Sequence, residues 1–295
     1  MASSAKSDPT SSQETTLIPS SVYQEFEPEA SSRRECPICY HGLPIDTGEH
    51  IYHTCCGQII CHGCAIGKQR TQLKESQFKK LGIIVEDTTP EEEQFRLIKE
   101  HGNNIYICPY CRTPPPFGDQ ELLQRLYDRI EIRNDRDYTI ALIQLGSYYN
   151  NGERGLPQNL TKAEELYKEA YDHDDPVAAW NLSCLYRNHY SDQKEKEKEM
   201  ECLLRGEMLG DIKCIQVLAK CAHDSGNMEE FTRLWMKVVC LGGDTSILLD
   251  CYRVNLLSKD DLATTLRANQ AVKNELETKR RDFASRYAQF LHDAS

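Results

Sequence analysis

Residues 141–149 read ALIQLGSYY, and residues 178–186 read AAWNLSCLY. The two stretches share an alanine, a leucine and a tyrosine at the same places, with a period of 37 residues from 141 to 178. A related stretch, CIQVLAKCA, follows at 214–222, which begins 36 residues after 178. A repeat of this length built from two helices is the signature of an α-solenoid, in which each helix pair stacks on its neighbours. The sequence therefore predicts a mainly α protein.

The sequence around these repeats carries the signals of helix starts. Leucine and isoleucine recur at steps of four after Asp119, which can serve as an N-cap. Asn159 or Thr161 can cap a later helix, and Thr161 with Glu164 forms a capping-box pair. Residues 258–295 match no repeat and are predicted to form C-terminal capping helices.

The first repeat resembles the Sel-one-like repeat, a relative of the tetratricopeptide repeat. The residues that match the family pattern are Ala141, Leu145, Gly146, Tyr149, Gly152, Gly155, Lys162, Ala163 and Ala170. Alanine and glycine suit places where helices approach closely, and the loop glycines permit the backbone turn. The match weakens in the second and third repeats. The resemblance implies an α-solenoid over 119–257 whose concave face holds a protein partner or substrate.

Eight of the fourteen cysteines gather in the first part of the chain. They form four pairs: Cys36 and Cys39, Cys55 and Cys56, Cys61 and Cys64, and Cys108 and Cys111. Tetrahedral zinc takes four ligands, and a spacing of two residues lets both cysteines of a pair face one ion. Four pairs therefore predict two zinc ions. A redox pair would be expected singly, and an iron–sulfur cluster would follow a ferredoxin spacing, so both alternatives remain but fit the pattern less well.

The order and text of these pairs, CPIC…CCGQIICHGC…CPYCR, resemble a RING finger. In that family the first and third pairs hold one zinc ion, and the second and fourth pairs hold the other. The resemblance therefore implies two sites, one of Cys36, Cys39, Cys61 and Cys64, the other of Cys55, Cys56, Cys108 and Cys111. The usual histidine before the third pair is Gln58 here, so Cys55 is expected to supply the missing thiolate in an all-cysteine variant. His53 and His62 remain rival ligands.

Composition divides the chain into segments. Residues 1–32 are rich in Ser, Thr, Pro and Glu and are expected to be disordered. Three prolines at 114–116 forbid helix and predict a stiff connector. The predicted order is a disordered tail (1–32), a RING-type finger (33–113) with a helical insertion (65–104), a proline-rich linker (114–118), a solenoid (119–257) and capping helices (258–295). The expected fold is therefore a small two-zinc cross-brace domain followed by an α-solenoid.

RING fingers bind a ubiquitin-conjugating enzyme and hold its ubiquitin thioester in a reactive pose, without supplying a nucleophile. The resemblance carries this partner role onto Ile38, Pro109 and Arg112, with Ile66 as the platform residue after the third pair. Ile38 and Pro109 also have a structural explanation, which is support of the zinc knuckle, and Arg112 has one in simple exposure to solvent. Two functions stay open: a ubiquitin ligase that recruits the conjugating enzyme through the finger and a protein partner through the repeats, or a non-enzymatic zinc-binding scaffold.

Charge and hydropathy argue against several classes of protein. With a formal net charge of −11 and a pI near 5.4, the chain lacks the basic footprint of a nucleic-acid or anionic-membrane binder. No stretch is apolar for long enough to form a transmembrane helix, and the N-terminus carries no signal-peptide or transit-peptide pattern. The chain is therefore expected inside the cell, in the cytoplasm or the nucleus, where thiols stay reduced and free to bind metal.

Overall fold

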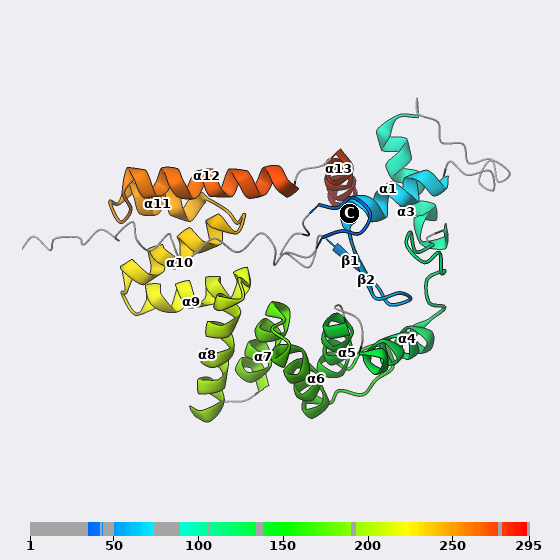
Figure 1. The fold of residues 1–295 in the computed structure, drawn as a ribbon, viewed down its shortest axis with the longest axis horizontal. Coiled ribbons are helices and arrows are strands. Elements are labelled where there is room, and N and C mark those ends of the chain that lie inside the picture. Colours follow the sequence, from blue (N-terminus) through cyan, green and yellow to red (C-terminus); the bar gives the residue numbers. More distant parts are fainter. Residues whose placement is uncertain are drawn as a thin grey trace, which may run out of the picture.

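The structure of the chain, a computed structural model, describes residues 35–41, 43, 50–73, 89–105, 107–133, 138–189, 193–276 and 279–293. Two short strands and a series of helices make up this part, so the prediction of a mainly α fold is confirmed (Figure 1). The expected disordered tail at 1–32 lies outside the described residues, as does the segment 74–88 of the expected helical insertion. None of the helices that the structure describes is long and apolar enough to cross a membrane.

A β-hairpin follows the first described turn at residues 35–41. Strand β1 (His50–His53) pairs antiparallel with β2 (Gln58–Cys61), with His50 opposite Cys61. The connecting turn contains Gly57 at φ 74°, a left-handed backbone that glycine adopts without the steric penalty of a Cβ. The hairpin therefore places His50 opposite Cys61, with a tight turn at residues 54–57 at its other end.

Two helices accompany the hairpin. Helix α1 (His62–Leu73) begins directly after β2, and α3 (Glu91–Ile105) follows Pro90. Pro90 suits the start of a helix because its missing N–H has no partner in the first turn. Three glutamates in the first turn of α3 suit the positive end of the helix dipole. The helices α1 and α3 pack against one another.

The remaining helices pack in consecutive pairs. Their bounds are α4 (Asp119–Ile132), α5 (Tyr138–Asn151), α6 (Leu160–Asp172), α7 (Pro176–His189), α8 (Gln193–Met208), α9 (Ile212–Asp224), α10 (Met228–Cys240), α11 (Ser246–Arg253), α12 (Lys259–Leu276) and α13 (Lys279–Asp293). Helix α5 packs on α6, α7 on α8 and α9 on α10, and each pair packs on the next. Helix α7 also touches both α5 and α9, so the first helices of the three pairs form a row.

Side-chain caps fix where several of these helices begin. Asn159 accepts a hydrogen bond from the backbone N–H of Lys162 at 2.9 Å, and Asp211 accepts one from the N–H of Cys214 at 2.8 Å. Each cap satisfies a backbone donor that has no partner inside the helix. Of the two caps that the sequence allows for α6, the structure therefore uses Asn159.

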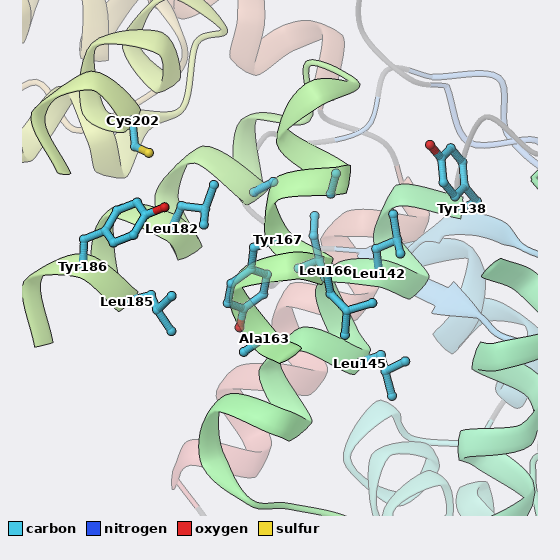
Figure 2. Close-up of a cluster of buried hydrophobic side chains, with 13 residues drawn as sticks. Tyr138, Leu142, Leu145, Ala163, Leu166, Tyr167, Leu182, Leu185, Tyr186 and Cys202 are labelled. Atoms are coloured by element: carbon cyan, nitrogen blue, oxygen red, sulfur yellow. The ribbon is translucent and has the colours of Figure 1, made fainter. Parts of the chain in front are cut away.

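The repeat residues build a continuous core between the helix pairs. Figure 2 shows this cluster, in which Leu145, Tyr167 and Leu182 come from three successive helices. Small residues let the helices approach closely: a Cβ added to Gly146 would lie 2.6 Å from a ring carbon of Tyr167, too close for any real contact. The alanine at 178 is fully buried where α7 meets its neighbours.

The two C-terminal helices pack on different parts of the protein. Helix α12 packs on α10 and α11, as expected of a cap on the solenoid. Helix α13 packs instead on α1 and α3, beside the N-terminal hairpin (Figure 1). The segment 258–295, expected to form one cap, therefore supplies two different structures. The apolar side chains of α13 find their partners on α1 and α3, which lie far away in the sequence.

The N-terminal part also contacts the start of the solenoid. The guanidinium of Arg129, on α4, donates hydrogen bonds to the backbone carbonyls of Thr54 at 3.1 Å and Cys55 at 2.5 Å. Ile140, on α5, packs against the apolar cluster around the hairpin. The N-terminal part of the described chain therefore contacts both the start of the solenoid, through α4 and α5, and the C-terminal helix α13.

Candidate metal centres

The first cluster of thiols joins Cys36, Cys39, Cys61 and Cys64, whose sulfur atoms all lie within 4.8 Å of one another. The first two cysteines lie in the turn that precedes the hairpin, the third ends β2 and the fourth lies in the first turn of α1. The Sγ atoms of Cys39 and Cys61 are 3.8 Å apart. Ligands at about 2.3 Å from a tetrahedral zinc ion are about 3.8 Å apart, so the spacing suits a metal.

The second cluster joins Cys55, Cys56, Cys108 and Cys111, again with all sulfur atoms within 4.8 Å. The adjacent pair lies in the turn of the hairpin, and the other pair lies between α3 and α4. The Sγ atoms of Cys56 and Cys108 are 3.7 Å apart, and those of Cys55 and Cys111 are 3.3 Å apart. These are non-bonded distances, far longer than the 2.05 Å of a disulfide. Alternate cysteine pairs along the chain therefore share a cluster.

The first and last pairs form two turns of the same geometry. The N–H of Tyr40 donates to the carbonyl of Cys36 at 2.8 Å, and the N–H of Arg112 donates to the carbonyl of Cys108 at 2.9 Å. Both donors have a left-handed backbone, with φ 59° and 61°. A residue with a side chain rarely adopts this conformation. Its recurrence directly after each C-P-x-C sequence indicates that both turns are built to hold thiols side by side.

Hydrogen bonding and burial set the charge of the thiols. Hydrogen bonds from the thiols of Cys61 and Cys64 hold the pKa of Cys36 well below its usual range. In the second cluster, burial raises the pKa of Cys56 to about 12 and also raises that of Cys55. Metal ligation requires each thiol to lose its proton, and four thiolates this close together need a cation to compensate their charge.

The rival histidines lie outside both clusters. His53 is buried at the end of β1, where burial lowers the pKa of its imidazole to about 4. Its carbonyl accepts hydrogen bonds from the N–H groups of Cys56 and Gly57, so the residue supports the turn that carries the adjacent cysteines. Neither His53 nor His62 belongs to a group of metal-ligating side chains in the described chain, whereas Cys55 does.

The four residues expected to contact a conjugating enzyme have different environments. Ile38 and Pro109 are half-buried in the first and last turns, and Arg112 is exposed. Ile66 is 4% exposed, because it lies in a cluster with side chains of α3 and α13. Ile38 belongs to the separate cluster around the hairpin. Three of the four positions are therefore accessible to solvent to some degree, and the fourth is covered.

Two exposed aromatic side chains were not predicted from the sequence as surface features. Tyr40 is 77% exposed directly after the first pair, and Tyr110 is 57% exposed inside the last pair. Their position beside the clustered cysteines is visible in the sequence. A side chain inside a tight turn has little room to point inward, so exposure could have been expected. They place an apolar ring at the tip of each turn.

No protein-family model matches the chain, and no curated protein matches its sequence. Among solved structures, a Sel1 repeat protein from Oxalobacter formigenes is 11% identical with a TM-score of 0.42, over 78% of this chain and 100% of its own. A protective antigen of uropathogenic Escherichia coli strains, described as displaying an SLR fold, is 15% identical with a TM-score of 0.35 over 76% of this chain. This chain spans 53% of the antigen's length. The repeat organisation is evident instead in the chain's own helix pairs.

Proposed function

We propose that the N-terminal part is a RING-type finger that holds two zinc ions in an interleaved arrangement. The observation that carries this proposal is the assembly of four cysteine pairs into two clusters of four thiols, with alternate pairs sharing a cluster. Sulfur–sulfur distances of 3.7 and 3.8 Å support tetrahedral coordination. Magnesium and calcium prefer oxygen ligands, whereas four thiolates favour zinc.

Zinc would act as a structural element here. Each cluster joins a cysteine pair of the hairpin region to a pair from another turn, so the ions would hold these segments together beside the apolar cluster around the hairpin. Because the four thiolates of a site exist together only with metal, the free energy of metal binding is also free energy of folding.

Metal analysis of the purified chain tests this part of the proposal. We expect about two zinc ions per chain, about one after Cys55→Ser, and no change after Cys221→Ser, which replaces an exposed cysteine on α9. A Cys55→Ser chain that keeps both ions, beside a His53→Ala chain that loses one, would show that the second ligand set is wrong. Iron in place of zinc would contradict the choice of metal.

We infer that the finger recruits a ubiquitin-conjugating enzyme. The accessible positions of Ile38, Pro109 and Arg112 on the two matching turns support this role. In the reaction assisted, a lysine amine attacks the thioester carbon, a C–N bond forms as the C–S bond breaks, and the amine proton compensates the leaving thiolate. The finger holds the reactants and supplies no nucleophile. Ile38→Ala and Arg112→Ala should slow this discharge while the zinc content stays the same.

The second function that the structure favours is that of a zinc-stabilised scaffold for protein–protein interaction. Its support is the burial of Ile66 under α13, which removes one expected contact with the conjugating enzyme. A scaffold would bind its partner through the repeats and discharge nothing. Discharge assays with a broad panel of conjugating enzymes distinguish the two functions, since a scaffold leaves the rate of discharge unchanged at any concentration of the chain.

The row of first helices is the surface that we propose for the protein partner. Helices α5, α7 and α9 carry Arg187, Lys213 and Lys220 against a single acidic residue, Asp224. Their partners α6, α8 and α10 carry eight basic and eleven acidic residues. Arg187 already pairs with Glu199 of α8 at 2.6 Å, so the positive charge of the row rests on Lys213 and Lys220. In a chain of net charge −11, this local positive charge favours an acidic partner segment. Lys220→Glu should weaken binding of a glutamate-rich peptide more than Lys162→Glu, a control on α6.

A further inference from the structure

Helix α13 covers one side of the finger with an apolar contact. Tyr287 and Ala284 are 7% and 3% exposed, and they share a cluster with Ile66 of α1. The ring of Phe95, on α3, lies 5.5 Å from the ring of Tyr287 and 5.6 Å from that of Phe290, measured between centroids. The contact therefore closes over the same face of α1 that carries Ile66.

The rim of this contact is ionic and open to solvent. Arg286 donates to both carboxylate oxygens of Glu91, at 2.9 and 2.8 Å, and also contacts Asp282 on its own helix. The side chains of Arg286 and Glu91 are 47% and 40% exposed. An exposed ion pair adds little stability, but it fixes how two surfaces align. An apolar centre with an exposed ionic rim is the anatomy of a protein–protein interface.

We propose that α13 is an autoinhibitory latch that competes with the conjugating enzyme for the face of α1 at Ile66. The inference rests on the proposed conjugating-enzyme function of the finger, whose regulation it describes. In the closed arrangement Ile38, Pro109 and Arg112 stay accessible, while Ile66 becomes available only after α13 leaves. Binding of the enzyme and docking of α13 are then mutually exclusive, so each weakens the other by the same factor.

The latch is tested on the full chain with variants of the ionic rim. Arg286→Glu places two carboxylates opposite each other and should release α13, and adding Glu91→Arg should restore an ion pair of reversed polarity. Gln289→Ala, on the exposed side of α13, is the matched control. Tyr287→Ala removes the apolar anchor independently of charge. The measurements are discharge of ubiquitin from a panel of charged conjugating enzymes to free lysine, amide hydrogen exchange over residues 62–68, and zinc content.

We expect Arg286→Glu and Tyr287→Ala each to speed discharge on the order of 5- to 150-fold, the usual range of coupling between two binding events. Exchange over 62–68 should rise in parallel, with zinc content unchanged. The charge-swapped double variant should return to the slow rate, and Gln289→Ala should match the parent chain. Ile66→Ala placed in the Arg286→Glu chain should abolish the gain, because the uncovered contact is lost.

Three results would overturn the latch. If the parent chain discharges ubiquitin and the released variants, with faster exchange over 62–68, do so no faster, α13 does not compete and the proposed function stands. If the released variants keep their zinc but discharge more slowly, α13 supports the finger instead of inhibiting it. If no form discharges any enzyme in the panel, the conjugating-enzyme function fails and the latch fails with it.

Discussion

Replacing Gly146 by alanine should destabilise the first repeat, against the usual trend for a helix interior. The same change normally stabilises a helix by about 1 kcal/mol, because alanine loses less backbone entropy than glycine. In this chain the new Cβ would lie 2.6 and 2.8 Å from two ring carbons of Tyr167. That ring is 3% exposed and enclosed by the core, so it cannot move aside freely. Overpacking of this kind costs about 1–3 kcal/mol, and we expect a net loss of about 1 kcal/mol.

A double-mutant cycle separates the clash from the helix propensity. Tyr167→Leu removes the ring, so in that background Gly146→Ala should become stabilising, by up to about 1 kcal/mol. Urea unfolding followed by circular dichroism measures each change as a shift of the midpoint at constant slope. If Gly146→Ala stabilises the chain in both backgrounds, the ring of Tyr167 does not cover Gly146. The close approach of α5 and α6 would then be wrong.

Three further predictions concern the metal and the caps. Chelation of the metal should remove hydrogen-exchange protection from residues 50–61 while α5 to α9 stay protected, because the proposed finger would fold with its ions. Loss of protection in α5 to α9 as well would show that the repeats are not stable without the metal. Arg129→Ala should lower the metal affinity of the second cluster roughly tenfold, since it releases the carbonyls of Thr54 and Cys55; competition with a chromophoric chelator measures this, with the exposed Arg133→Ala as control. Burial raises the pKa of Asp211 above its ordinary 3.8. The folded chain therefore binds this proton more tightly than the unfolded chain does. As a result, the free energy of unfolding falls as pH rises through the folded pKa. Asp211→Asn keeps the cap and should reduce that fall at pH values above the ordinary pKa of 3.8. Identical pH profiles of the urea midpoint in both chains would refute the linkage.

The helix pairs were predictable because their signals are local. The apolar residues at helical spacing, the close-packing alanines and the asparagine at 159 all act within a few turns of their own position. The sequence left Asn159 and Thr161 as equal candidates for one cap, and only the backbone of the helix start decides between them. Local sequence signals thus predict which segments are helical, but they do not decide which of two neighbouring residues caps a helix.

The grouping of the cysteines and the place of α13 depend on contacts between distant segments. Spacing indicates that a cysteine pair faces one ion. Which two pairs share that ion depends on how the hairpin folds back, and only the resemblance to a RING finger predicted the grouping that the structure shows. In the same way, the apolar side chains of α13 indicate that it has a partner without identifying it. Burial of Ile66 follows from that partner, so a position expected at a surface lies inside a cluster. The contact between Ile66 and Tyr287 cannot be predicted from the sequence of either segment alone.

The separation of 195 residues between Glu91 and Arg286 has a consequence for how the chain is made. A ribosome adding 5–20 residues per second needs roughly 10–40 s to travel from one to the other. Throughout that interval the apolar side chains of α1 and α3 have emerged and their cover has not yet been synthesised. Such a surface is where a nascent chain attracts chaperones or associates with its neighbours on a polysome. Closure of α13 over α1 and α3 must therefore wait until the residues between them have been synthesised, and it covers an apolar surface that stays exposed until then.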